Sequence, residues 1–188
     1  FTNPASFLKN WNGLPDPVEA APAVIKRYLS AYGPATPETF DAWLSRNSNK
    51  KSTLRSWFAS LGEQIVEVRV EGETRYLLAE HEDELAATRP SRATHLLGAF
   101  DQFVLGPGTK DTHMLAHEHR PLVSKAAGWI APVLTQGGRI TGVWEMDDGN
   151  LVVTPFPGEQ APPSQVLEDA AARLAAVHGS VKVTPRVD

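Results

Sequence analysis

The sequence contains no cysteine, so a disulfide framework, a thiolate metal site and a cysteine nucleophile are excluded. It also has no apolar run as long as a bilayer-spanning helix requires, which excludes a transmembrane segment. The first residue is Phe1 rather than methionine, and no charged and apolar leader sequence begins the protein. We therefore expect a cytoplasmic piece or processed product of a longer protein, not a targeted precursor.

An excess of positive charge is missing as well. The protein has 18 basic and 22 acidic residues, for a formal net charge of −4. The charge is −3 over residues 1–88 and −1 over residues 89–188. A field that would draw the whole protein onto nucleic acid or an anionic membrane is therefore absent. Any contact with nucleic acid has to come from a local patch of basic side chains.

What is present is a composition that can build a core. Hydrophobic residues make up 41% of the 188 residues, which is enough for one large domain or two small ones. The segment 1–15 is rich in asparagine, proline and glycine and has no hydrophobic period. We expect an extended arm there.

The rest of the N-terminal half has the pattern of three short helices and a β-hairpin. Apolar residues recur with helical spacing in residues 16–32 and again around Phe40, in a segment that Thr36 can cap. A third helix is predicted from a stripe formed by Leu54, Trp57, Phe58 and Leu61. The hydrophobic period then changes to two in residues 66–79. This order is that of a winged helix, a helix-turn-helix variant, which we place at residues 16–88.

The remainder, residues 89–188, is predicted to form a β-rich domain. Its strands are separated by turn residues that tolerate positive φ. The three predicted strands are 129–135, 139–146 and 151–156. A helix capped by Ser164 and a closing strand at 180–184 are expected to follow. The predicted fold class is therefore α+β.

The sharpest functional signal lies at the start of the third predicted helix. Between residues 46 and 55 there are four cations, no acidic residue, and several hydroxyl and amide side chains. The N-terminal end of a recognition helix enters the major groove of DNA, where cations hold phosphates and amides read base edges. A solvated polar face is the alternative interpretation. The predicted DNA-binding residues are Arg46, Asn49, Lys50, Lys51, Ser52 and Arg55.

The predicted wing, the β-hairpin after the third helix, is evidence against DNA binding. Glu71 and Glu73 flank Gly72 at its tip, and an acidic tip repels the phosphate backbone of DNA. A protein-interaction module that binds no DNA therefore stays open as a function of a different class.

Histidines do not predict a metal site, and no cofactor is expected. His113 and His117 are one helical turn apart and could share a metal ion, with His119 close by. No second set of ligands is evident, and the order of residues is not that of a zinc-protease motif. A surface segment is the simpler interpretation.

Carboxylates give no catalytic set either. Asp101 and Glu145 lie among apolar residues, which is typical of buried structural carboxylates with partners. Asp147 and Asp148 are explained by the hairpin turn that they begin. The sequence therefore predicts no catalytic residue.

Two stretches resemble a known family. The first is IKRYLSAYGPATPETFDAW at residues 25–43, and the second, between residues 96 and 144, contains LLGAFDQFVLG, HEHRPLV, GWIAPVL and GGRITGVW. These segments are similar to the bacterial winged-helix DNA-binding family that includes the crosslink-repair DNA glycosylases. The match runs from about Val24 to Phe156, and GGRITGVW and the GPAT-type segment are its more specific parts.

The resemblance implies tandem winged helices followed by a C-terminal β-barrel, in proteins considerably longer than this one. These residues then correspond to the C-terminal half, with an N-terminal part of the same protein missing. The family's glycosylases use a Gln-x-Gln pair in their N-terminal part to position water. None of the five glutamines here is two residues from another. The fragment alone is therefore predicted not to be a glycosylase.

Together these observations predict a winged-helix protein that binds double-stranded DNA. The preferred interpretation is the C-terminal fragment of a crosslink- or alkylation-repair DNA glycosylase-like protein without its catalytic part. A transcriptional regulator and a protein-interaction module are the alternatives.

Overall fold

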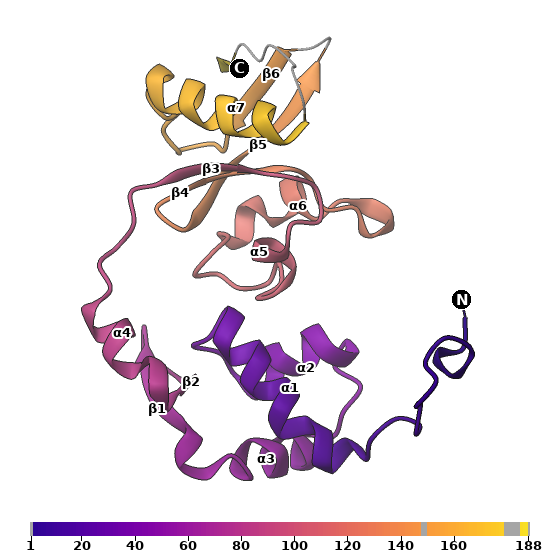
Figure 1. The fold of residues 1–188 in the computed structure, drawn as a ribbon. Coiled ribbons are helices and arrows are strands. Elements are labelled where there is room, and N and C mark those ends of the chain that lie inside the picture. The colour runs from indigo at the N-terminus through magenta and orange to yellow at the C-terminus, as the bar shows by residue number, and fades with distance from the viewer. Residues whose placement is uncertain (1, 148–149, 179–184, 188) are drawn as a thin grey trace. The chain divides into compact units, whose positions relative to one another are not determined.

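A computed structural model describes residues 2–147, 150–178 and 185–187 of the protein. The protein divides into two compact units, Phe1–Ala86 and Ala87–Asp188, which we call unit 1 and unit 2 (Figure 1). No helix in the described ranges combines the length and the hydropathy that crossing a membrane requires.

Unit 1 consists of three helices and a hairpin, as the sequence predicts. The helices are α1 (Pro17–Tyr32), α2 (Pro37–Ser45) and α3 (Lys51–Ala59), and the antiparallel strands are β1 (Ile65–Val70) and β2 (Glu73–Leu78). A short helix, α4 (Glu82–Ala87), follows. Three single 3₁₀ turns lie at Pro4–Ser6, Gly62–Gln64 and Ala79–His81.

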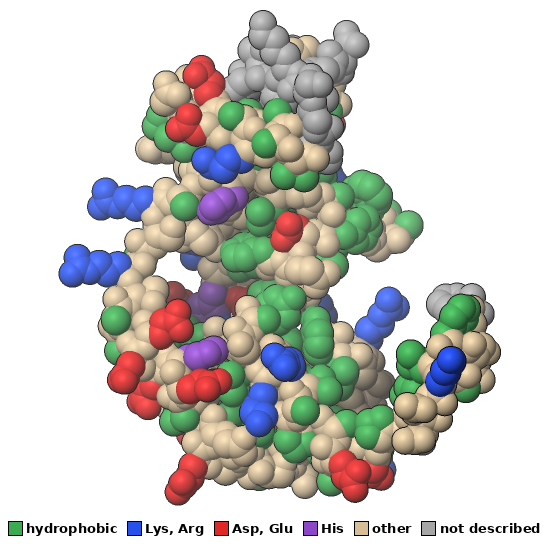
Figure 2. All heavy atoms as spheres, viewed as in Figure 1, with side chains coloured by type: hydrophobic (Ala, Val, Ile, Leu, Met, Phe, Trp, Pro, Cys, Tyr) green, Lys and Arg blue, Asp and Glu red, His purple; other side chains and the backbone are tan. Residues whose placement is uncertain are grey.

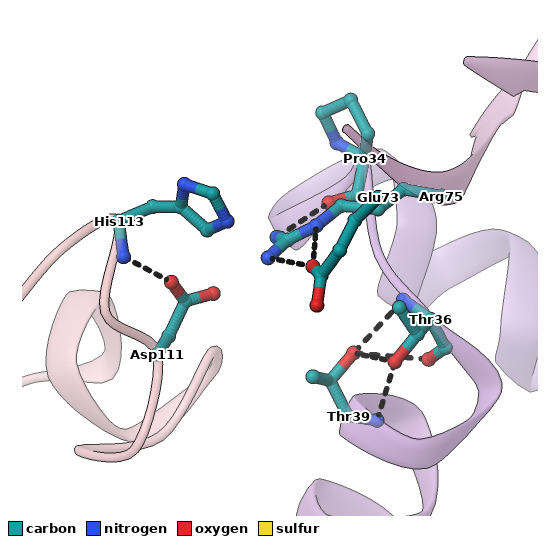
Figure 3. Close-up of polar contacts among 7 residues, drawn as sticks. All are labelled: Pro34, Thr36, Thr39, Glu73, Arg75, Asp111 and His113. Carbon is teal, nitrogen blue, oxygen red and sulfur yellow. Dashed lines mark hydrogen bonds and ion pairs between the residues drawn. The ribbon is translucent and has the colours of Figure 1, made fainter. Parts of the chain in front are cut away.

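Local capping sets where the helices of unit 1 begin. The Asp16 carboxylate accepts a hydrogen bond from the backbone N–H of Val18 at 2.8 Å and caps α1. At α2, the Thr36 hydroxyl accepts from the Thr39 N–H at 3.1 Å, and the Thr39 hydroxyl accepts from the Thr36 N–H at 3.0 Å (Figure 3). This reciprocal capping box satisfies two backbone donors that the helix cannot.

An aromatic core joins the three helices to the hairpin. Phe40 is completely buried, and its ring contacts Tyr28 of α1 at 5.4 Å and Phe58 of α3 at 5.8 Å between centroids. Phe58 in turn contacts Tyr76 of β2 at 5.3 Å. The loop between α1 and α2 joins the hairpin too, because Ala35 and Tyr76 exchange two backbone hydrogen bonds of 2.9 and 2.8 Å.

Unit 2 is built on one sheet with the strand order β3-β4-β5-β6-β7. The strands are β3 (Thr94–Leu97), β4 (Val133–Gln136), β5 (Arg139–Asp147), β6 (Asn150–Pro155) and β7 (Pro185–Val187). The first four pair antiparallel, and β7 pairs parallel to β6. The helices are α5 (Gln102–Leu105), α6 (Arg120–Val123) and α7 (Ser164–His178), with 3₁₀ turns η4 (His117–His119) and η5 (Ala126–Gly128).

The sheet is open, and this corrects the barrel-like domain expected from the sequence. Within the described ranges β3 and β7 are the two edges and do not pair with each other. Helical segments cover both faces instead (Figure 1). Leu134 and Trp144 pack with Leu167 of α7 on one face, whereas Val133 and Ile140 pack with Val123 of α6 on the other. Because both faces are already buried, closure is not needed to shield the sheet from water.

Two strands predicted from the sequence also differ from the structure or lie outside its described part. The strand expected at 129–135 begins only at Val133, and the closing strand expected at 180–184 lies outside the described residues. The Gly137-Gly138 turn is confirmed, with φ of 59° and 81°.

Gly142 within the GGRITGVW segment allows β5 and β6 to approach closely, since a Cβ atom there would lie 2.7 Å from the Thr154 carbonyl oxygen of β6.

Candidate nucleic-acid interface

The connection between α2 and α3 is built around a buried carboxylate, Asp41, which is 3% exposed. Its Oδ1 accepts hydrogen bonds from the Ser45 hydroxyl at 2.5 Å and from the Asn49 side-chain amide at 2.7 Å. Its Oδ2 accepts from the Asn49 backbone N–H at 3.3 Å. A buried carboxylate is tolerated when it is supplied with donors in this way. The network therefore fixes the turn that leads into α3.

The backbone of that turn is left-handed at two successive residues. Arg46 has a φ of 57° and Asn47 a φ of 64°. The Asn47 N–H donates to the Asp41 carbonyl oxygen at 3.2 Å, which closes the end of α2. The conformation reverses the backbone and leaves the Arg46 side chain exposed.

Asn49 is occupied by this network. Its side-chain amide donates to the carboxylate of Asp41 and to the Ser45 hydroxyl, at 2.7 and 3.0 Å. An amide that reads a base edge needs its donor and acceptor free. The geometry therefore assigns Asn49 to holding the start of α3 in place rather than to contact with a ligand.

The α3 helix separates its apolar and basic side chains onto different faces. Leu54, Trp57 and Phe58 are buried in the core of unit 1. The other predicted cations and the predicted serine stand in solvent: Lys50, Lys51, Ser52 and Arg55. Among the residues that the structure describes, Arg46, Lys50 and Lys51 form no ion pair. Their charge is therefore available to an anion from outside.

The N-terminal end of α3 adds to this positive potential. Lys50 occupies the N-cap position, and the helix has no cap from a side-chain hydrogen bond there. The first N–H groups of a helix point outward and carry the positive end of the helix dipole. An uncapped N-terminus with cations at its first two positions is well suited to a phosphate.

The hairpin next to α3 presents the opposite charge. Its turn is made by Glu71 and Gly72, with φ of 48° and 90°. Glu73 pairs with Arg75 at 3.1 Å, and Arg75 also donates to the Pro34 carbonyl oxygen at 3.5 Å (Figure 3). Acidic side chains gather over the hairpin and α4 (Figure 2). This side of unit 1 repels a phosphate backbone.

A cavity of about 310 Å³ opens beside α3 in unit 1. Among the predicted site residues, only Arg55 lines it. The lining residues are Pro37, Arg55, Phe58, Ala59, Gly62, Ile65, Glu67 and Tyr76. The cavity thus has an apolar floor with one cation, one carboxylate and one phenol at its sides.

The pKa of the Tyr76 phenol, which lines this cavity, is shifted from its ordinary value. Burial raises the pKa of Tyr76 above its ordinary value of 10.0, and the charge of Glu67 raises it further. The Tyr76 hydroxyl donates to a Glu67 carboxylate oxygen at 3.3 Å. The phenol therefore stays protonated and acts as a hydrogen-bond donor at neutral pH.

Two of the histidines singled out by the sequence, His113 and His119, make separate contacts in unit 2. His119 is buried and packs its ring on Phe156, with centroids 4.6 Å apart. The backbone N–H of His113 donates to the Asp111 carboxylate at 2.9 Å (Figure 3). Within the described ranges, no group of three or more histidine and acidic side chains is arranged to hold a metal ion.

The carboxylates singled out by sequence have separate positions. Asp101 caps α5 by accepting from the Phe103 N–H at 2.8 Å. Glu145 lies exposed on β5, so the expectation of a buried carboxylate is wrong for it. Its side chain is on the face opposite Trp144, where the core reaches along β5 only as far as Val143. Asp147 ends β5, and Asp148 lies outside the described residues. These groups form no catalytic pair.

Sequence reasoning misses two features of the interface. The local pattern does not distinguish Asp41 from any other residue of the second helix, and only its spacing of four to Ser45 and eight to Asn49 indicates the network. The bond pair between Ala35 and Tyr76 has no local signal, since the two residues are far apart in the sequence.

Comparisons with known proteins identify relatives of this one. The family described as "DNA glycosylase AlkZ-like" matches residues 4–177. A protein of Streptomyces sahachiroi described as "Interstrand DNA cross-link repair glycosylase" is 54% identical over 188 residues, which is 100% of this chain. The solved structure "Streptomyces sahachiroi DNA glycosylase AlkZ" superposes with a TM-score of 0.93 at 52% identity and covers 97% of this chain.

These relatives are about twice as long as this chain of 188 residues. The match spans 51% of the curated relative and 49% of the solved structure. The family match over residues 4–177 and the length of the relatives agree with the resemblance of residues 25–43 and 96–144, whereas the β-barrel that the resemblance implied is not formed by the residues that the structure describes.

Proposed function

Because the chain belongs to the AlkZ-like DNA glycosylase family, we propose that it is a DNA-binding part of a DNA-repair glycosylase. The observation that carries the proposal is the group of exposed cations at the uncapped start of α3, formed by Arg46, Lys50, Lys51 and Arg55. In this role they hold backbone phosphates of double-stranded DNA. The damaged substrate is proposed to be of the class named for the relative, an interstrand crosslink.

We propose a winged helix over residues 16–88 as the structural basis of this binding. Two observations support it: the order of three helices and a hairpin, and the isolated antiparallel bridge that Ala35 forms with Tyr76 of β2. In such a fold α3 is the recognition helix. Residues 89–188 are then a separate β-rich domain, and the site of action is the bacterial cytoplasm, where the chromosome lies.

The acidic hairpin limits how this unit contacts DNA. Glu71 and Glu73 lie at the position from which a basic wing would reach the backbone. We therefore propose that α3 contacts the duplex without the wing, and that binding by this part alone is weak. The same acidic surface favours a protein-interaction module as the second candidate function.

A salt titration of binding to duplex DNA distinguishes the two functions. The 188-residue protein is titrated onto a labelled duplex, and affinity is measured by fluorescence anisotropy at increasing salt. A DNA-binding part loses affinity steeply with salt, with a slope of about 0.9 for each phosphate contacted. An interaction module shows no affinity for the duplex even at low salt, and that result contradicts the proposal.

A matched pair of triple variants locates the contact. Lys50, Lys51 and Arg55 are changed together to alanine, which is expected to lower the salt slope by about 2 to 3 at one phosphate each. The control changes three other exposed cations, Lys9, Arg27 and Arg89, and removes the same charge. Equal losses in the two variants would show that overall charge, and not α3, governs binding.

The 188 residues alone are expected to bind without catalysis. Removing a damaged base requires a pocket for the flipped nucleotide and a group that places water at the sugar. None of the five glutamines has the spacing of the family's water-positioning pair. Incubation with duplex carrying an alkylated purine, followed by detection of abasic sites, is expected to give none. Turnover by a contaminant-free preparation contradicts this expectation and directs mutagenesis to Asp101 and Glu145.

A further inference from the structure

A second cavity, of about 220 Å³, lies within unit 2, and none of the predicted site residues lines it. Its wall contains two permanent cations, one imidazole and two hydroxyls, and none of its lining residues is acidic. The lining residues are Thr109, Lys110, Thr112, Leu115, His117 and Arg120. Every polar side chain in this wall can therefore donate a hydrogen bond.

The cations of this cavity lack an acidic counterpart. The guanidinium of Arg120 uses its Nε to donate to the Thr109 hydroxyl at 3.2 Å, which orients the group. Among the described residues, its terminal nitrogens and the Lys110 ammonium make neither a hydrogen bond nor an ion pair. Two like charges at one recess repel each other unless an anion lies between them. The positive charge of the recess is therefore not balanced by an anionic side chain among the described residues.

The wall is held firmly by the core of unit 2. Leu115 is 1% exposed at the base of the cavity. The adjacent Met114 carbonyl oxygen accepts from the Ile140 N–H of β5 at 2.8 Å, which ties the segment to the sheet. His119, between the lining residues His117 and Arg120, is buried against Phe156. The core therefore fixes the backbone that carries the donors, while the side chains of Lys110, Thr112 and His117 are exposed to solvent.

The nearest acidic side chains in the sequence do not neutralise the recess from within. Asp111 follows Lys110 directly, but its carboxylate accepts the His113 N–H at 2.9 Å and does not line the cavity (Figure 3). Glu118 is exposed and does not line the cavity either.

We propose that this cavity binds a phosphate group. A phosphate has enough acceptor oxygens to take the guanidinium, the ammonium and the hydroxyls at once, and arginine binds it through a two-nitrogen fork. The group comes either from the backbone of DNA, in which case the inference rests on the proposed function, or from a free phosphate. In the first case unit 2 contacts the duplex independently of α3.

The first arm of the test uses inorganic phosphate and needs no DNA. The imidazole C–H resonances of the histidines are followed by NMR at fixed pH and ionic strength, and that of His117 is identified by its loss in His117→Gln. Phosphate is expected to shift this resonance with a saturating curve, and to leave it unmoved in the Lys110→Ala/Arg120→Ala double variant. A resonance of His117 that does not respond in the wild-type protein overturns the proposal, whatever the protein does with DNA.

The second arm identifies the source of the phosphate. If one backbone phosphate fills the cavity, Lys110→Ala, Arg120→Ala and the double variant each lose the same single contact, about 0.9 in the salt slope of duplex binding. Lys125→Ala, which removes an exposed cation of unit 2 outside the cavity, is the control and keeps the wild-type slope. An unchanged slope in the double variant, together with a positive first arm, assigns the cavity to a free phosphate and overturns the contact with DNA.

Discussion

The two units of the molecule place their cations in different surroundings. In unit 1 the basic side chains stand on the exposed face of α3, on a turn fixed by a buried carboxylate, Asp41. In unit 2 the exposed Lys110 and the half-buried Arg120 line a recess together with the buried Leu115. An exposed cation keeps its hydration and attracts phosphates over a distance. The cations that line a recess also bind at short range, because several donors face one anion there.

The units also differ in how they bury apolar surface. Unit 1 has one aromatic core in which three helices and a hairpin meet, so each large ring contacts several elements. Unit 2 has two smaller cores, one on each face of its sheet. Damage to the single core is expected to affect all of unit 1, whereas damage in unit 2 starts on one face.

The largest expected effect tests this difference in unit 1. Trp57 is 8% exposed in the core, and Trp57→Ala is expected to lower the stability of unit 1 by roughly 3–5 kcal/mol. Denaturant unfolding, followed by circular dichroism, should then show an early transition from unit 1 and a later one from unit 2. A single unchanged transition contradicts the assignment of Trp57 to the core.

A smaller effect is expected at the sheet of unit 2. Gly142→Ala places a Cβ atom 2.7 Å from the Thr154 carbonyl oxygen and 3.0 Å from the Pro155 Cα, both backbone atoms. Such overpacking costs about 1–3 kcal/mol. Gly98→Ala is the matched control, since its Cβ meets no atom within 4 Å and its φ is not in the left-handed region. Thermal melts that rank the two variants equally would contradict the close approach of β5 and β6.

The smallest expected effect depends on pH and belongs to unit 1. The folded state raises the pKa of Tyr76, so it holds the phenolic proton more tightly than the unfolded state does. The stabilisation from this difference is fully present below pH 10, the ordinary value, and is lost as the pH rises through the folded pKa. Tyr76→Phe should remove this part of the alkaline loss of stability, measured as unfolding midpoints from about pH 8 to about pH 11. The same alkaline loss in Tyr76→Phe would mean that another group causes it.

The order of elements in unit 1 could be predicted from the sequence because its signals are local. Leu54, Trp57 and Phe58 recur with the helical period in α3. Thr36 caps α2, which begins at the next residue. The same holds for the Gly137-Gly138 turn in unit 2. The strand that begins late, at Val133, shows the limit of such signals, because an apolar run does not by itself separate a strand from a packed loop.

The candidate site was predictable in its charges and not in its geometry. Consecutive cations without an acidic residue are visible in the sequence, and the exposure of Lys50 and Lys51 agrees with that pattern. The role of Asn49 was not visible, because its amide is taken up by Asp41, eight residues earlier. The recess around Arg120 was not visible either, since its donors belong to a turn, a 3₁₀ segment and a short helix without a shared period.

The sequence by itself determined α1 to α3, the Gly137-Gly138 turn and the local basic patch, since each depends on residues close together along the backbone, and it determined the family through two recognisable stretches. Only the tertiary structure decided that the sheet of unit 2 stays open, that Asp41 is buried and supplied with donors, and that Lys110 and Arg120 share one cavity. These properties depend on which distant segments pack against one another. That packing is set by the total apolar surface to be covered and by the hydrogen bonds that every buried polar group requires.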